Sequence, residues 1–362
     1  MWKKIVLGIL IVISAAVGFG IAKMQSIMTG TLNQVTRDTE NVFKDVELPE
    51  GVAAESDDSV VNILLVGSDK RVEKISGFRS DGLTDAMMIA TMDKKHGALK
   101  LTTIMRDTVA RIAGTEEDRK INSAVNNGGI KNLYKTIALN YHIKLDGYVL
   151  VTFTAFENVV NAVGGVEVEL TDTEVRYLNM TNYVKKQYHQ LKVGKQTLNG
   201  NQALGYCRIR KGKDKIGEPV VTASGMIDDY GRTWRQRTLL SAIFTKMKTL
   251  PKAKWLEIAE KVAQCVKTDL DNDSIYGYLE DIIMMGTTKV NQLQIPYDGY
   301  YRYTGKGEFP YCSGSGLVPT NGISSLYDAS ANEDIMKTFI FKYNGKDEFV
   351  YQDPNRTETQ EE

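Results

Sequence analysis

The sequence predicts an α/β fold: a layered α-β-α sandwich with a central mixed sheet, preceded by one N-terminal transmembrane helix. Short apolar runs, typical of buried strands, alternate with segments of helical periodicity. Hydrophobic residues make up 42% and charged residues 25% of the 362 residues, a globular composition that can fill a sizeable core. Residues 5–22 carry no charge, and this run is near the shortest that crosses ~30 Å of hydrocarbon as a helix.

The uncharged segment 5–22 is interpreted as an uncleaved membrane anchor. Lys3 and Lys4 precede it together with the α-amino group, so the positive-inside rule places residues 1–4 in the cytoplasm, although Lys23 weakens this asymmetry. A cleaved signal peptide is the rival interpretation. Because residues 20–22 form a poor cleavage site and the apolar run exceeds a usual signal-peptide core, we favour the anchor. The rest of the chain is then expected outside the cell membrane.

Three regions follow the anchor. Residues 23–58 are polar, with an acidic run at 55–58, and are expected to form an extracytoplasmic stalk. Residues 59–350 hold the alternating strand and helix patterns and are expected to form the folded, catalytic domain. The acidic tail at 351–362 is predicted to be disordered.

The elements of the domain are predicted from apolar runs and helical stripes. Helices are expected at 130–142, 154–163, 199–204, 231–249 and 253–266. Residues 171–197 are polar and are interpreted as a surface segment or lid. Strands are expected at 61–66, 86–92, 99–105, 148–153, 166–170 and 206–210, with 166–170 continuing the sheet and a hairpin at 93–97.

Charge and cysteine content exclude several classes of protein. Lys plus Arg and Asp plus Glu are both 45, so nothing indicates a nucleic-acid partner, and an anion site must come from local clustering. Cys207, Cys265 and Cys312 lack zinc-site spacing, and three cysteines cannot form a disulfide scaffold. We interpret the three cysteines as small core residues, and a single disulfide bridge remains the alternative.

The ends of the first three strands carry charged residues. Asp69 and Arg71 follow the first strand, Asp85 precedes the second, and Arg106 and Asp107 follow the third. If the second strand runs antiparallel to both neighbours, these positions lie at one end of the sheet, where α/β sheets usually bind ligands.

Further cations are spaced to join them. Arg208 and Arg210 share one face of the expected strand, and Arg232, Arg235 and Gln236 share one face in the first turns of the long helix, beside Asp229. Guanidinium forks and a helix N-terminus suit phosphate oxygens, and aspartates beside phosphates suit Mg²⁺ or Mn²⁺. The pattern predicts a metal-assisted pyrophosphate site. The sequence contains neither a P-loop nor a dinucleotide-binding fingerprint, so a nucleotide ligand is not indicated.

At these residues the chain resembles the LytR-CpsA-Psr family of cell-wall glycopolymer transferases. The resemblance covers about 60–248, and the anchor matches the family's layout. It rests on eight blocks in the family's order: 62–71, 84–88, 104–108, 120–122 with 128–129, 163–166, 198–204, 208–210, and 229–232 with 235–236.

The resemblance implies a reaction and a location. A glycopolymer (teichoic acid, or a capsular or other secondary polysaccharide) leaves undecaprenyl pyrophosphate for a peptidoglycan sugar hydroxyl, at the outer face of the cell membrane of a Gram-positive-type bacterium. The lipid is expected to need an apolar tunnel between the sheet and the long helix. Asp69 and Asp85 would hold the metal, Asp107 or Asp229 would orient or deprotonate the hydroxyl, and the oxygens would be bound by Arg106, Arg208, Arg210, Arg232 and Gln236, with Arg71 and Lys120 as lesser candidates.

Three departures from the family pattern leave alternatives open. The family usually has Arg-Ser-Asp-Thr directly before its second strand, whereas here Arg-Ser-Asp at 79–81 is separated from Thr84, so Asp81 competes with Asp85 as metal ligand. Met105 stands where the family commonly has proline. The connection at 211–228 is longer than usual and could be a lid or a polymer-selecting loop.

Two other functions also fit the sequence. A non-catalytic module that binds polyprenyl phosphates, and tethers or regulates wall enzymes, would need the arginines but not the aspartates. A polyprenyl pyrophosphatase would use water as the acceptor.

Overall fold

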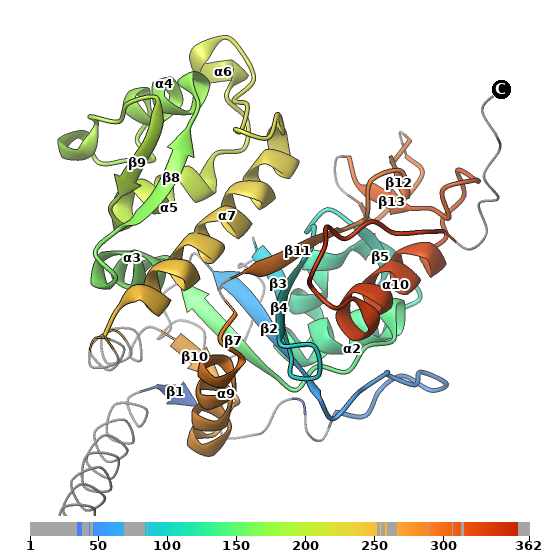
Figure 1. The fold of residues 1–362 in the computed structure, drawn as a ribbon. Coiled ribbons are helices and arrows are strands. Elements are labelled where there is room, and N and C mark those ends of the chain that lie inside the picture. The colour runs from blue at the N-terminus through green and yellow to red at the C-terminus, as the bar shows by residue number, and fades with distance from the viewer. Residues whose placement is uncertain are drawn as a thin grey trace, which may run out of the picture.

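The computed structural model describes residues 35–37, 43, 46–68, 84, 86–251, 254, 258, 266–287, 289–305, 307–312 and 315–353. Its centre is a seven-stranded mixed sheet in the order β1-β10-β7-β2-β3-β4-β11 (Figure 1). In that order the strands are Thr36–Arg37, Val266–Thr268, Gly147–Thr152, Val60–Ser68, Ala86–Asp93, Ala98–Ile104 and Val290–Ile295.

Alternation of side chains along the strands divides the packing between the two faces of the sheet. Leu64 and Val66 of β2 pack in one cluster with α2 (Gly129–Tyr141) and α10 (Ser330–Lys337), which is followed by the π-helix η4 (Thr338–Lys342). Val61 and Ile63 of the same strand face α7 (Asp228–Thr249) and α9 (Asn272–Met285) on the other side. Figure 1 shows α2 and α10 on one side of the sheet and α7 on the other. The predicted layered architecture is therefore confirmed.

A second cluster lies beyond the end of the sheet. It is formed by α7, α3 (Phe153–Ala162), α4 (Asp172–Met180), α5 (Gly200–Arg208) and the antiparallel pair β8–β9 (Val166–Leu170 and Gly194–Leu198). The short elements α6 (Lys213–Ile216) and η3 (Lys186–Tyr188) belong to the same region (Figure 1). Helix α3 ends at Ala162, one residue before the predicted end, and Gly164 and Gly165 follow with positive φ angles of 85° and 87°, which are typical of a helix stop.

Three predictions about this region are wrong. The 166–170 strand does not continue the central sheet but pairs with β9. The polar segment 171–197 is folded, because Thr171 and Glu174 form a capping box that starts α4, and Tyr177 and Leu178 are buried. No strand exists at 206–210, because the helix that Asn199 caps continues to Arg208.

Parts of the predicted stalk, 23–58, pack against the domain. Phe43 is buried with its ring centroid 4.5 Å from that of Tyr134, and β1 pairs with β10. At the other end, the Tyr351 hydroxyl donates to Asp334 at 2.6 Å, so the packed chain reaches into the segment 351–362. The predicted anchor at 5–22 and most of the helix predicted at 253–266 lie outside the described residues. Within the part of the chain that is described, no helix is long and apolar enough to cross a bilayer.

A buried ion pair joins α7 to α4. The Arg235 and Glu174 side chains are both fully buried, and Arg235 Nε lies 2.6 Å from Glu174 Oε1. The remaining guanidinium nitrogens donate to the carbonyls of Ile209 and Val220 at 3.4 and 3.3 Å. One arginine thus holds three segments of the second cluster together.

We expect Arg235→Ala to lower the free energy of unfolding by about 3–5 kcal/mol, because it leaves the Glu174 carboxylate buried without a partner. Arg176, which pairs with Asp172 at 2.8 Å on the surface, is the matched control, and Arg176→Ala should cost no more than about 1 kcal/mol. Chemical denaturation followed by circular dichroism measures both. Equal losses in the two variants would contradict the buried role.

Candidate active site

The ends of four strands lie side by side at one edge of the central sheet. Gly67 pairs with Ala86 in the β2–β3 ladder, Met87 pairs with Ile104 in the β3–β4 ladder, and Ser68 pairs with Thr152 of β7. Strand β3 is antiparallel to both neighbours, which is the condition under which these strand ends are expected to meet. Asp69, Arg71, Asp81 and Asp85, however, lie outside the described residues, so their predicted convergence stays a prediction.

Arg106 and Asp107 lie in the segment that directly follows β4 at this edge of the sheet. Met105, at the position where the resemblance leads one to expect proline, is buried, and its backbone N–H donates to the Ile295 carbonyl at 2.8 Å. This bond continues the β4–β11 pairing by one residue. The backbone is therefore fixed directly before the two charged residues.

Asp107 collects three cations. Its Oδ1 lies 3.0 Å from Lys120 Nζ, and its Oδ2 lies 3.2 Å from Arg210 Nη2 and 3.8 Å from Arg106 Nε. Its side chain is mostly buried, which strengthens these contacts relative to pairs in open solvent.

Asp229, in the first turn of α7, is the second carboxylate. Its Oδ1 lies 2.9 Å from both Arg210 Nε and Arg232 Nη2. Arg210 therefore bridges the two carboxylates, one of which follows the sheet while the other starts the long helix. We name the six residues the charge cluster: Arg106, Asp107, Lys120, Arg210, Asp229 and Arg232. Four cations against two anions leave a formal charge of +2, so the charge cluster attracts a polyanion such as pyrophosphate.

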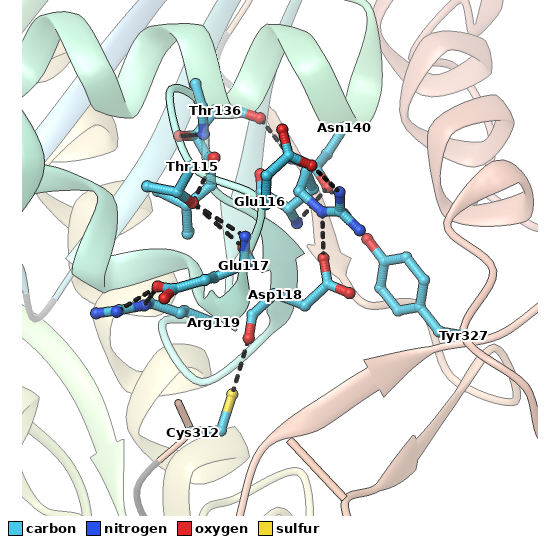
Figure 2. Close-up of polar contacts among 12 residues, drawn as sticks. Thr115, Glu116, Glu117, Asp118, Arg119, Thr136, Asn140, Cys312 and Tyr327 are labelled. Carbon is cyan, nitrogen blue, oxygen red and sulfur yellow. Dashed lines mark hydrogen bonds and ion pairs between the residues drawn. The ribbon is translucent and has the colours of Figure 1, made fainter. Parts of the chain in front are cut away.

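Lys120 is positioned by the hairpin β5–β6 (Val109–Arg111 and Asp118–Lys120). Arg111 Nε lies 2.6 Å from Asp118 Oδ1. Arg119 Nε donates to Glu117 at 2.6 Å (Figure 2), so two ion pairs hold the hairpin together. The C-terminal part of the chain supports the hairpin, because the Cys312 thiol lies 3.9 Å from the Asp118 carbonyl oxygen (Figure 2).

Two apolar cavities lie between the sheet and α7. The strand-end cavity, about 130 Å³, is lined by strand ends that include Gly67 and Ala86, by Phe153 and Phe156 of α3, and by α5 and α7. The sheet-face cavity, about 250 Å³, continues along the same face toward α9. Leu65 and Leu240 line both cavities, so the two cavities are neighbours on this face of the sheet.

Polar groups stand at the strand-end cavity. Gln236 lines it, and the Gln236 Oε1 atom is buried without a hydrogen-bond partner, which is costly in the absence of a ligand. The Arg208 guanidinium carbon lies 5.3 Å from the ring centroid of Phe153, another lining residue. Cys207 also lines the cavity, and burial raises the pKa of its thiol to about 12, so the thiol stays protonated. Cys207 and Cys312 are free, and Cys265 lies outside the described residues.

The structure brings most of the predicted cations together, with one correction. Arg235 was predicted to bind pyrophosphate, but it is buried against Glu174 inside the second cluster. Its helical position was predicted correctly. Arg232 and Arg235 differ in their partners, because Arg232 contacts Asp229 in the charge cluster and Arg235 contacts Glu174 of α4. Lys120, only a lesser candidate in the sequence, contacts Asp107 directly. The apolar lining from α3 and α5 was not predicted and has no signal beyond ordinary core residues.

The metal prediction concerns residues that the structure does not describe. Among the described residues, no group of three or more carboxylates, histidines or cysteines could hold a metal ion. Asp107 and Asp229 each form ion pairs with arginine or lysine, so their carboxylates are not arranged as a pair of metal ligands. A metal ion here would depend on Asp69, on Asp85 or Asp81, and on the phosphate oxygens.

Known proteins resemble this chain in sequence and in fold. The LytR_cpsA_psr family model matches residues 22–311. The polyisoprenyl-teichoic acid–peptidoglycan teichoic acid transferase TagU of Bacillus anthracis (strain CDC 684 / NRRL 3495) is 28% identical over 304 residues, which cover 83% of this chain and 90% of TagU. TagV of Bacillus subtilis (strain 168), a transferase with the same descriptive name, is 33% identical over 192 residues, 52% of this chain and 45% of TagV, so the match spans under half of TagV.

A solved structure shares the fold. The structure described as LytR-CPS2A-psr family protein YwtF (TagT) with bound octaprenyl pyrophosphate lipid superposes with a TM-score of 0.54 at 22% identity, covering 82% of this chain and 99% of that chain.

We expect Lys120→Ala and Arg210→Ala each to weaken the binding of inorganic pyrophosphate by about tenfold or more, because each removes a charge-assisted hydrogen-bond donor from the charge cluster. Arg235→Met, in contrast, should leave the affinity of the folded protein unchanged. Isothermal titration calorimetry measures the affinities. Equal weakening by Arg235→Met in a folded sample would show that pyrophosphate binds elsewhere.

Proposed function

The chain belongs to the LytR-CpsA-Psr family, and on this premise we propose that it transfers a glycopolymer from undecaprenyl pyrophosphate to a sugar hydroxyl of peptidoglycan. The observation that carries the proposal is the position of the charge cluster at the strand ends, beside apolar cavities that continue along the sheet. A ligand that fits both parts has a pyrophosphate and a hydrocarbon chain. The names of TagU and TagV, and the lipid bound to YwtF, support the same substrate class.

The proposed binding mode follows from these two surfaces. The lipid lies along the sheet-face and strand-end cavities, and its pyrophosphate sits among Arg106, Lys120, Arg210 and Arg232. Arg208 and Gln236, at the strand-end cavity, contact the oxygens nearest the lipid. The two cavities are proposed to form the apolar tunnel expected between the sheet and the long helix.

The reaction balances as a phosphoryl-type transfer. The acceptor hydroxyl oxygen attacks the phosphorus atom that carries the glycopolymer, and a new oxygen–phosphorus bond forms. The bond from that phosphorus to the bridging oxygen breaks, and undecaprenyl phosphate leaves with the bonding electron pair. The proton of the hydroxyl passes to the Asp107 or Asp229 carboxylate. The four cations stabilise the negative charge that grows on the phosphate oxygens and on the leaving group.

Mg²⁺ or Mn²⁺ is proposed as the cofactor. Asp69, with Asp85 or Asp81, would hold it on the pyrophosphate, where it would neutralise charge. Arg71 is proposed to contact the same phosphates. Binding of Mn²⁺, followed by electron paramagnetic resonance, should weaken in Asp69→Asn whether or not the protein is active.

The proposed location completes the function. The predicted anchor at 5–22 would place the N-terminus in the cytoplasm and the catalytic domain outside the cell membrane of a Gram-positive-type bacterium, where lipid carriers and peptidoglycan meet. Teichoic acid is the polymer that the relatives' names favour. Capsular and other secondary polysaccharides fit the same chemistry.

We expect the full chain, supplied with Mg²⁺, a lipid-pyrophosphate oligosaccharide and peptidoglycan strands, to form a polymer–peptidoglycan phosphodiester. Arg106→Ala should lower the rate about 100-fold or more, because it removes a donor aimed at the developing charge, and Asp69→Asn should abolish transfer. Arg176→Ala, far from the charge cluster, is the control.

Mass spectrometry of the products separates the alternatives. Cleavage of the donor at the same rate without peptidoglycan would indicate a pyrophosphatase. Tight lipid binding without any cleavage, unaffected by Asp69→Asn, would indicate a regulator or tether.

We expect Leu240→Trp to weaken the binding of a polyprenyl pyrophosphate about tenfold or more, because the larger side chain fills space shared by the two cavities. Binding of inorganic pyrophosphate should not change. Thr245→Trp, on the exposed side of α7, is the matched control. Equal lipid affinity in both variants would place the hydrocarbon chain elsewhere.

A further inference from the structure

Three tyrosines form a continuous row beside the charge cluster, and we name them the tyrosine ladder. The Tyr230 ring stacks on Tyr301, with centroids 5.6 Å apart and an interplanar angle of 27°. The Tyr301 and Tyr303 rings meet edge to face at 6.1 Å. Tyr230 is partly buried, whereas Tyr303 is 60% exposed, so the ladder runs outward to the surface.

The inner end of the ladder adjoins the charge cluster through the chain itself. Tyr230 directly follows Asp229 in the first turn of α7. Tyr301 and Tyr303 belong to β12 (Tyr301–Tyr303), which pairs with β13 (Leu317–Pro319). Strand β13 is fixed to the segment after β4, because the Leu317 N–H donates to the Asp107 carbonyl at 2.8 Å. Both carboxylates of the charge cluster therefore have direct connections to elements that carry the ladder.

An aromatic row that ends in solvent suits a sugar chain. Pyranose rings present flat patches of C–H groups, which pack on the negative faces of aromatic rings, and their hydroxyls remain available to water and to polar neighbours. The ladder uses three rings that differ in tilt. Such a row can follow the turn between successive sugars of a strand.

The charges beside the ladder favour a neutral sugar chain over a polyanion. Asp228 and Asp298 are exposed near it. Burial is the main cause that raises the pKa of Tyr303, followed by Tyr301 and then by Asp228 and Asp229. Asp228 and Asp229 directly precede Tyr230 of the ladder at the start of α7. The exposed carboxylates Asp228 and Asp298 repel a phosphate-rich polymer at the ladder, whereas the charge cluster, with its formal charge of +2, attracts one.

From these observations we infer that the tyrosine ladder is the acceptor subsite. It binds the neutral N-acetylhexosamine strand of peptidoglycan by ring stacking and presents one of its hydroxyls to Asp229. The inference rests on the proposed transferase function and adds to it the route of the acceptor. It also selects Asp229 over Asp107 as the carboxylate nearest the attacking hydroxyl, and it makes Tyr303 a positioning residue.

The first test separates acceptor from donor kinetics in the full chain. Tyr303→Leu removes the ring from an exposed site and should raise the KM for peptidoglycan strands about tenfold, while the KM for the lipid-linked donor stays unchanged. Tyr303→Phe keeps the ring and should behave like the unmodified protein. Tyr311→Leu is the matched control, because Tyr311 is 56% exposed but its ring is paired with Arg119 rather than with the ladder.

Two kinetic results would overturn the inference. An unchanged acceptor KM in Tyr303→Leu would exclude the ladder as the acceptor subsite. A raised donor KM with an unchanged acceptor KM would assign the ladder to the donor polymer instead.

The second test does not depend on transfer. Saturation-transfer NMR with N-acetylglucosamine oligosaccharides should show binding to the unmodified full chain and to Tyr311→Leu, and about tenfold weaker binding to Tyr303→Leu. If no donor is ever cleaved but this pattern holds, the sugar subsite stands and the transferase proposal fails. If transfer occurs but the oligosaccharides bind all variants equally, the subsite fails and the transferase proposal stands.

Discussion

The bridge made by Arg210 is the interaction on which the arrangement of the site depends. Its guanidinium contacts Asp107, which follows the central sheet, and Asp229, which starts the long helix. Each carboxylate also contacts a second cation, so it keeps an ion-pair partner if a bound ligand draws the arginine away. A planar group with several donors can make both contacts at once, whereas a lysine could not. The bridge thereby fixes the distance between the sheet edge and the helix that covers it.

The apolar part of the site is a consequence of strand alternation. Even-numbered side chains of β2 fill the core under α2, and odd-numbered ones face α7, where packing leaves two cavities instead of a closed interior. The same helix supplies the cavity wall, through Leu240, and the start of the charge cluster, through Asp229. One helix therefore lines the apolar cavities and carries a carboxylate of the charge cluster, and Arg235 joins the same helix to α4.

The sequence patterns predicted those elements and site residues whose structure depends on neighbouring residues in the chain. The strands of the sheet centre, the helices near 130–142 and 231–249, and the positions of Arg106, Asp107, Asp229 and Arg232 follow from periodicity and from residues at strand and helix ends. Arg210 was expected on a strand at 206–210, but it instead follows α5, which ends at Arg208, and contacts Asp107 and Asp229 from there. The predicted role of Arg235 is wrong because its partner, Glu174, lies 61 residues away in the sequence. Residue spacing does not show that an arginine is buried against so distant a partner. The segment 171–197 failed because a few buried apolar residues lie among many lysines and tyrosines, which hides the helical stripe.

The attachment of β13 to Asp107 has a consequence for how such a protein can diverge. That contact joins two backbones, so it does not specify which side chains the hairpin carries. Substitutions along β12 could therefore accumulate in a lineage without disturbing the charge cluster. Recognition of a binding partner and the chemical reaction would then depend on different strands and could change independently. A duplicated gene could acquire a new partner by changes in the hairpin alone.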